Sequence, residues 1–416
     1  MHNMNPHMHR KLHVAMVALW LCITAFCADK TNIALDPANF PAEMKDEVQQ
    51  IDAGYRKFPD DASVLYQVAS LHARARHFPQ ALAALHKMEE VGAGLQPRPR
   101  DFPGLDKNLD FRQICFAIQK KNPPIQRARL AYELQEGDLV PEGIAWSQTA
   151  RKFYLGSVKR KIVAVSEDGV VQDFVKPAVD GLGTVIGLRV DDQRGELWAI
   201  SGSIGPKPDD VVAGVFRYKL SDGSIIHLYT IQGSEKEMLN DLVVAHDGLV
   251  YVTATNSGAL YRIDPASSKI EKFLPDGSLP DPNGITVTSD DKYLFVAGWY
   301  GISRVTLKNK KVDLLDKPAN IADGCIDGLY IYGKSDLIGV QNCNHDPGRI
   351  LDFHFLFDTK IDSVRVLESY NPMFEGITTG AIVGDQFYFM ANTQFRKLGQ
   401  PDAKFDALKI LRVNLK

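Results

Sequence analysis

A template that recurs six times between residues 142 and 416 constrains this chain more than any other feature. Each copy begins with a marked residue, usually followed by Gly, and continues as an apolar-alternating strand, a turn and a second strand. A third and often a fourth strand follow. Four strands per unit of about 40–50 residues are typical of a propeller blade. The marked residues, with spacings of 44, 54, 43, 44 and 48, are Glu142, Ile186, Asn240, Asn283, Asp327 and Glu375.

The predicted fold is therefore mainly β, a six-bladed β-propeller over residues 126–416, with a small N-terminal α-helical region. A β-sandwich also uses short alternating strands, but it does not explain six copies of one template. The last copy lacks its outermost strand at the end of the chain. Residues 127–136, RARLAYELQE, have strand character, and we expect them to complete the sixth blade and remove an open sheet edge.

Residues 29–125 have a helical period instead. Apolar residues recur at three- and four-residue steps on both sides of residues 77–79, which predicts two helices, and residues 107–122 predict one more. The pair resembles a tetratricopeptide unit, and one such pair cannot bury its own apolar face. The segment is therefore either a structural cap or docking element, or a site that recruits a protein partner.

Residues 1–28 predict a secretory signal peptide. Basic residues precede the apolar run VAMVALWLCITAFCA, which ends in a small-x-small sequence at Ala25–Cys27. The run is short for a helix that spans a bilayer, although an uncleaved N-terminal anchor is the alternative. We expect an exported protein, periplasmic or extracellular, that leaves the membrane after cleavage.

The cysteines and the net charge argue against a zinc site and against nucleic acid as a partner. After cleavage the chain keeps Cys115, Cys325 and Cys343; the last two pair if their strands are adjacent, whereas buried thiols are the more common outcome. No Cys/His cluster has zinc spacing. The net charge of −3, without a basic stripe, argues against nucleic acid as a partner.

The marked residues predict a metal site. The first strand of each blade lines the central channel, so these residues form a ring at one mouth, and five of the six carry oxygen donors. Converging carboxylates repel one another, and buried amides need partners. Calcium, which accepts six to eight oxygen ligands in irregular geometry, satisfies both. The alternative is ordinary turn chemistry of Asn or Asp before Gly, but turn residues would not keep one register.

Four runs resemble the senescence-marker, gluconolactonase and regucalcin family of propellers, with diisopropylfluorophosphatase and paraoxonase as distant relatives. They are EGIAW at Glu142, LNDL at Asn240, PNGI at Asn283 and IDGL at Asp327. The resemblance covers about residues 127–416. It implies one divalent cation, usually calcium, with Glu142, Asn283 and Asp327 as direct ligands and Asn240 as a ligand or a substrate contact. Asp327 is also implied as the general base of lactone hydrolysis, with Asp323 as the alternative register.

One departure concerns the substrate. Lactonases that act on sugar acids carry an Arg shortly before the first Asn, where this chain has Met238 and Leu239. The second strand of each blade runs back to the ring, so its far end also lines the mouth. Candidate substrate-binding residues at these ends are Asn256, Trp299, Asn342, His345 and Asn392.

Two functions fit these features. The first is an exported, calcium-dependent hydrolase of small lactones or esters, in which Asp327 or Glu375 accepts the proton. The second is a non-catalytic propeller whose calcium is structural and which binds a ligand or a protein. Strictosidine-synthase-like condensation is a remote third, because that activity shares the fold but not this complete set of metal-ligand residues. One fold hosts many functions, so the fold does not decide between them.

Overall fold

The protein is described by a computed structural model that covers residues 32–203, 210–231, 237–342 and 348–416. This part of the chain divides into two compact units, one that ends at Asn122 and one that begins at Pro123. No helix in these ranges is long and apolar enough to cross a bilayer. The predicted signal peptide, residues 1–28, lies outside the described residues.

The N-terminal unit is helical. Asp61 caps one helix by accepting hydrogen bonds from the backbone N–H groups of Ser63 and Val64, at 2.8 and 3.1 Å. The next helix has Pro79 in its first turn and ends at Gly92 in the left-handed region. The predicted pair and the later helix are confirmed, the first helix was not predicted, and the tetratricopeptide resemblance stays a prediction. The α-helices in the described residues are α2 (Lys45–Lys57), α3 (Ala62–Arg74), α4 (Phe78–Val91) and α5 (Leu109–Lys121).

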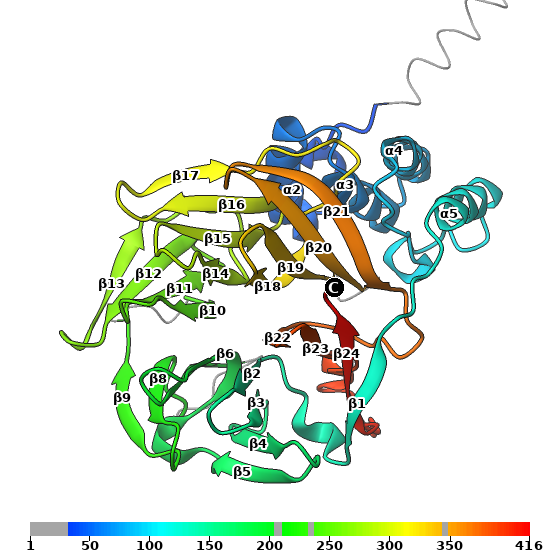
Figure 1. Cartoon of the computed structure of the whole chain (residues 1–416). Coiled ribbons are helices and arrows are strands. Elements are labelled where there is room, and N and C mark those ends of the chain that lie inside the picture. The colour runs from blue at the N-terminus through cyan, green and yellow to red at the C-terminus, as the bar shows by residue number, and fades with distance from the viewer. Residues whose placement is uncertain (1–31, 204–209, 232–236, 343–347) are drawn as a thin grey trace, which may run out of the picture. The chain divides into compact units, whose positions relative to one another are not determined.

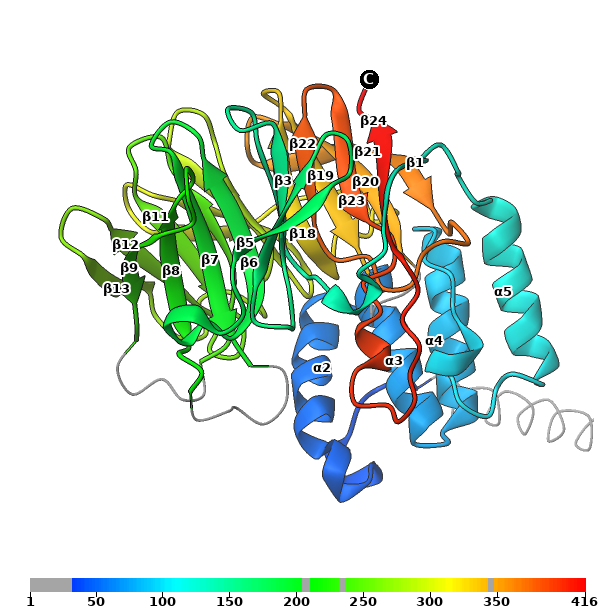
Figure 2. The ribbon, with the colours of Figure 1, turned by 90° about the horizontal axis from the view of Figure 1, so that it is seen from below.

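The C-terminal unit is a six-bladed β-propeller, as predicted. In the described residues each blade is a four-stranded sheet whose first strand lies innermost, around the central channel (Figure 1). Figure 2 shows the strands from the side. Blades one to three are β2 (Ile144–Ser147), β3 (Lys152–Gly156), β4 (Ile162–Ser166), β5 (Val171–Val175); β6 (Thr184–Asp191), β7 (Glu196–Gly202), β8 (Gly214–Lys219), β9 (Ile225–Tyr229); and β10 (Leu239–Val244), β11 (Val250–Ala254), β12 (Ala259–Asp264), β13 (Lys269–Leu274). Blades four to six are β14 (Ile285–Val287), β15 (Tyr293–Gly298), β16 (Gly301–Thr306), β17 (Lys311–Leu314); β18 (Ile326–Tyr332), β19 (Asp336–Gln341), β20 (Arg349–Leu356), β21 (Lys360–Ser369); and β22 (Gly380–Val383), β23 (Gln386–Met390), β24 (Leu408–Asn414), β1 (Arg129–Leu134).

The sixth blade joins the two ends of the propeller. Its outermost strand is β1, which pairs antiparallel with β24 and places Leu134 opposite Leu408. Figure 1 shows β1 beside β24. The prediction that residues 127–136 complete this blade is confirmed, and the edge of β24 is covered by a hydrogen-bonded neighbour.

The Gly of the template is required by the narrow channel. A Cβ atom on Gly143 would lie 2.4 Å from the carbonyl oxygen of Ile186 in the next blade. One on Gly284 would lie 2.2 Å from the carbonyl oxygen of Asp327. Neither distance can accommodate a side chain, so the innermost strands approach this closely only because these positions are Gly.

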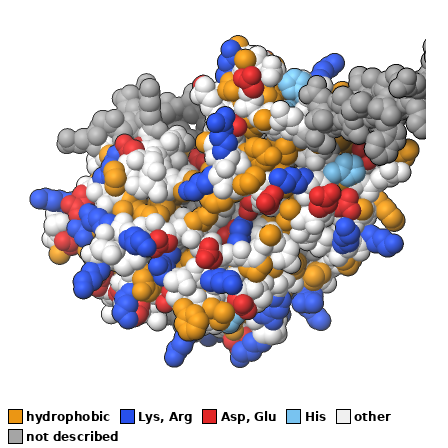
Figure 3. All heavy atoms as spheres, turned by 90° about the horizontal axis from the view of Figure 1, so that it is seen from above, with side chains coloured by type: hydrophobic (Ala, Val, Ile, Leu, Met, Phe, Trp, Pro, Cys, Tyr) orange, Lys and Arg blue, Asp and Glu red, His pale blue; other side chains and the backbone are white. Residues whose placement is uncertain are grey.

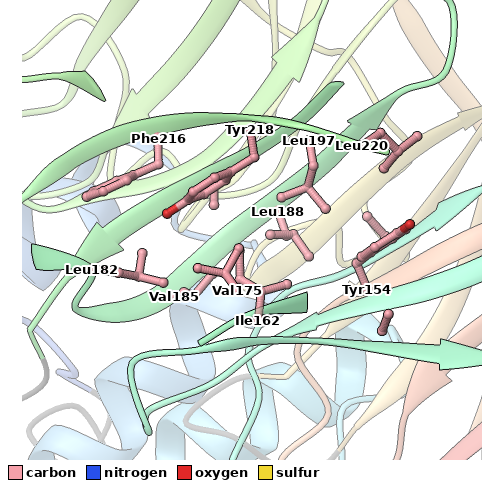
Figure 4. Packing of buried hydrophobic residues seen from close by; sticks show 13 residues of the cluster. Tyr154, Ile162, Val175, Leu182, Val185, Leu188, Leu197, Phe216, Tyr218 and Leu220 are labelled. Carbon is pink, nitrogen blue, oxygen red and sulfur yellow. The ribbon is translucent and has the colours of Figure 1, made fainter. Parts of the chain in front are cut away.

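Apolar side chains fill the spaces between the blades. In the described residues, six buried clusters each join two neighbouring blades. Figure 4 shows one of them, where Tyr154 of β3 and Ile162 of β4 pack with Leu188 of β6 and Phe216 of β8. Burial of each such side chain contributes about 1.5–3 kcal/mol, so the clusters fix the blades around the channel.

The outer surface carries charges of both signs. On the face drawn in Figure 3, Lys and Arg side chains are intermingled with Asp and Glu side chains. Elsewhere in the described residues, ion pairs join neighbouring strands, such as Arg304 with Asp313 at 3.1 Å and Arg365 with Asp352 at 2.7 Å. Opposite charges on neighbouring strands of a sheet stabilise their pairing by up to about 1 kcal/mol.

Two leucines on β1 allow a test of whether this strand packs into the sixth blade. Leu134 of β1 is 2% exposed and belongs to the cluster between blades six and one, whereas Leu130 on the same strand is 47% exposed. We expect Leu134→Ala to lower the free energy of unfolding by about 2–5 kcal/mol, because it leaves a cavity in that cluster. Leu130→Ala, the matched control, should change it by less than about 1 kcal/mol. Equal effects in chemical denaturation would contradict the packing of β1 into the ring.

Candidate functional site

A cavity of about 290 Å³ lies where the innermost strands of the propeller begin. It brings together all four residues predicted to be near a metal. Glu142 and Asn283 precede β2 and β14 by two residues, and Asn240 and Asp327 are the second residues of β10 and β18. Their role as ligands stays a prediction. The lining residues are Glu142, Met238, Asn240, Thr255, Asp281, Asn283, Gly298, Trp299, Cys325, Ile326, Asp327 and Asn342.

The two ring carboxylates are strongly perturbed. Burial, followed by the negative charges of Asp327 and Asp241, raises the pKa of Glu142 to about 8. Burial also raises the pKa of Asp327 to about 7, although a hydrogen bond from Asn342 opposes the shift. Among the described residues, no side chain donates a hydrogen bond to the Glu142 carboxylate. Without a cation, the ring therefore disfavours the ionised forms of both carboxyl groups.

The amide side chains are oriented by their hydrogen bonds. Asn240 donates from Nδ2 to Oγ1 of Thr255 at 3.0 Å, which leaves Oδ1 as an available acceptor. Thr255 in turn donates to the carbonyl oxygen of Pro282 at 2.8 Å. Asn342 donates from Nδ2 to Oδ2 of Asp327 at 2.7 Å and to the carbonyl oxygen of Ile377 at 2.5 Å. Asn342 thus holds the Asp327 carboxylate in place.

This donor set fits a hard divalent cation. Glu142, Asn240, Asn283 and Asp327 offer only oxygen ligands, which calcium and similar ions prefer. Within the described ranges, no three His, Cys, Asp or Glu side chains form a group that could hold a metal. A cation at the ring would consequently depend on amide oxygens and water as well as on the two carboxylates.

The remaining two ring positions carry no acid. Ile186 packs in the cluster between blades two and three. The sixth position is Thr378, not Glu375, because the backbone N–H of Gly328 donates to the carbonyl oxygen of Thr378 at 3.0 Å. The Thr378 hydroxyl then donates to the carbonyl oxygen of Glu142 at 3.1 Å.

Glu375 lies away from the cavity. Its backbone N–H donates to the carbonyl oxygen of Ala391 at 2.8 Å, and its carboxylate is 3.7 Å from Nζ of Lys397. The Glu-Gly pair at residues 375–376 imitates the template, but β22 begins only at Gly380. Glu375 is therefore not among the residues that line the site.

The predicted substrate contacts divide into three groups. Trp299 and Asn342 line the cavity. Asn256 and Asn392 do not line it; Asn392 instead donates to the carbonyl oxygen of Ala407 at 2.9 Å and accepts from the backbone of Lys409 at 2.7 Å. His345 lies outside the described residues.

Several lining residues were not predicted from the sequence. Met238, Thr255, Asp281 and Ile326 are neighbours of the marked residues or of strand ends, so their proximity to the ring was the available signal. Cys325 also lines the cavity and is disulfide-bonded, so the expectation of a buried thiol is wrong for this residue. Cys343, which the sequence left open as a partner, lies outside the described residues.

This chain is similar in sequence to a paraoxonase/lactonase and in fold to regucalcin and gluconolactonase structures. Serum paraoxonase/lactonase 3 of Rattus norvegicus is 26% identical over 242 residues, which cover 49% of this chain and 64% of that protein, so the chain spans less than two thirds of its relative. The calcium-binding protein regucalcin of Agrobacterium tumefaciens matches with a TM-score of 0.49 at 14% identity, covering 69% of this chain and 96% of that one. A gluconolactonase of Xanthomonas campestris matches with a TM-score of 0.47 at 17% identity, covering 69% and 89%. No protein-family model matches the chain.

The raised pKa of Glu142 predicts how stability depends on pH. Between the ordinary value of 4.5 and about 8, the folded metal-free protein binds more protons than the unfolded chain. Its free energy of unfolding should therefore fall as the pH rises through this window, by an amount on the order of a few kcal/mol. Urea unfolding in the presence of a chelator measures this slope. Glu142→Gln should flatten it, and an unchanged slope in that variant would contradict the assignment.

Proposed function

We propose that this protein is a metal-dependent hydrolase of small lactones or esters, with calcium or another divalent cation at the ring. One observation carries the proposal: the buried carboxylate of Asp327 and the partly buried carboxylate of Glu142 meet amide groups in a single cavity, whose lining contains no Lys, Arg or His among the described residues. Such a set of charges favours a cation. The similarity to a serum paraoxonase/lactonase supports the reaction class.

Each of the chain's own residues would have a distinct part in this reaction. Glu142, Asn283 and Asp327 would hold the cation, and Asn240 would offer Oδ1 to it or to the substrate. When bound, the cation polarises a carbonyl oxygen and makes water easier to deprotonate. Asp327 would accept the proton from water, since it lines the cavity and Asn342 holds its Oδ2 atom in place.

The walls of the cavity favour an uncharged substrate. Met238, Trp299 and Ile326 supply apolar surface, and Asp281 adds a third carboxylate to the lining. With no basic side chain in the described lining, an acidic substrate would form no ion pair with a protein side chain there.

Export remains part of the proposal. It rests on the basic and apolar composition of residues 1–28, which end in a small-x-small sequence. Expression of the whole chain followed by N-terminal sequencing of the secreted or periplasmic material is the direct measurement. Cleavage near residue 28 supports export, and an intact N-terminus on cell-associated protein contradicts it.

Substitution of one acidic residue inside the cavity and one outside it tests whether the cavity is the functional site. We expect Asp327→Asn to weaken calcium binding by at least about tenfold and to abolish lactone or aryl-ester hydrolysis, because it removes a charge from the ring. Glu375→Gln is the matched control, and it should leave both properties unchanged because Glu375 lies outside the cavity. Calorimetric titration of calcium and a hydrolysis screen on the same samples provide the measurements.

The same experiment distinguishes catalysis from a structural role for the metal. Calcium that binds and raises the Tm, without turnover of any substrate, would favour a non-catalytic propeller that uses the cavity to bind a ligand. Equal losses in Asp327→Asn and Glu375→Gln would instead contradict the placement of the site.

The substrate preference can be tested at Met238. Met238→Arg would supply the cation that the lining lacks, so we expect KM for a carboxylate-bearing lactone to fall by about three- to tenfold. KM for a neutral lactone should stay within about twofold. Met238→Gln is the uncharged control, and an equal change in both variants would argue against a role for charge.

A further inference from the structure

An ion pair shielded from solvent joins the innermost strands of blades two and three next to the ring. Arg189 of β6 donates from Nη2 to Oδ2 of Asp241 in β10 at 2.6 Å. Its guanidinium also lies over the ring of Tyr330 in β18, 5.1 Å from the centroid. Both partners are buried, with side-chain exposures of 16% for Arg189 and 4% for Asp241. Blades two, three and five are thereby connected through their innermost strands.

Backbone groups extend this connection to the other blades. Asp241 accepts hydrogen bonds from the backbone N–H of Leu242 at 2.8 Å and of Ile285, in β14, at 3.4 Å. The hydroxyl of Tyr330 accepts from the backbone N–H of Gly380, in β22, at 2.9 Å. The network touches the innermost strands of blades two to six, and it contains one full positive and one full negative charge.

This pair lies next to the ring. Asp241 directly follows Asn240 in β10, and its Oδ2 atom accepts from the backbone N–H of Ile285, two residues after Asn283. Charges that are shielded from water interact more strongly than exposed ones. A change of charge at Asp241 or Arg189 must consequently alter the potential at the ring.

We infer that Arg189 and Asp241 form a neutral bridge that sets the charge of the ring, and through it the affinity for a divalent cation. The inference rests on the proposed metal site. Neither residue lines the cavity, so both act as positioning residues that work through their field and their contacts. Arg189 cancels the charge of Asp241, and the ring presents its own two carboxylates to the cation.

The charges predict an order of affinities for calcium. Asp241→Asn leaves the guanidinium uncompensated beside the ring, so the dissociation constant should rise by at least about tenfold. Arg189→Met removes the positive charge, so binding should become tighter than in the wild type. The double variant carries neither charge, and its affinity should return to within about threefold of the wild type.

Titration of the full chain with calcium, followed by calorimetry, tests this order. Rescue in the double variant supports the bridge, because a purely structural role would make the double variant at least as weak as Asp241→Asn. Tyr330→Phe is the control: it removes the hydroxyl but no charge, so it should lower the Tm and leave the affinity within about twofold. If Asp241→Asn fails to fold, Arg189→Gln, which keeps a donor towards Asp241 without the charge, should still bind calcium more tightly.

The outcomes separate this inference from the proposed function. A wild type that binds calcium, beside variants whose affinities are unchanged or fall together, overturns the bridge alone. A wild type that binds no divalent cation overturns the proposed metal site and the bridge with it.

Discussion

The pairing of β1 with β24 is the constraint on which the rest of the propeller depends. Each blade is stabilised mainly by the apolar clusters that it shares with its two neighbours, so the ring of blades is stable as a unit only when it closes. The pair joins residues separated by more than half of the chain. Because the closure is non-local, the channel and everything that lines it form only when both ends of the propeller have met.

Closure also brings like charges together. The innermost strands approach so closely that Gly143 and Gly284 have no room for a side chain, and the residues beside them are held near the axis. Glu142 and Asp327 lose solvent there without gaining a cationic partner, which disfavours their ionised forms. A fold that keeps these two carboxylates close together is poised to bind a cation, since binding would relieve the repulsion that folding creates.

Features that depend on local pattern could be predicted from the sequence. The strands and the shared cavity of Glu142, Asn240, Asn283 and Asp327 result from a template that recurs in register. Glu375 was misplaced because a Glu-Gly pair imitates the template five residues before β22 begins. The α2 helix was missed because only Val48, Ile51 and Gly54 are buried in a largely polar segment. The disulfide at Cys325 depends on positions that spacing alone does not determine.

Blades two and three depart from the template in ways that compensate each other in charge. Neither blade shows this when its sequence is considered alone. Blade two has Ile186 where other blades have an oxygen donor, and blade three has Asn-Asp where blades one, two, four and five have a residue followed by Gly. In the structure, blade two contributes Arg189 three residues further along β6, and this side chain meets the additional acid, Asp241, of blade three. Without Arg189, Asp241 would add a third buried negative charge next to Glu142 and Asp327. The two irregularities therefore form one ion pair, in which the guanidinium of Arg189 balances the carboxylate of Asp241 and leaves the two carboxylates of the proposed metal site unpaired with it.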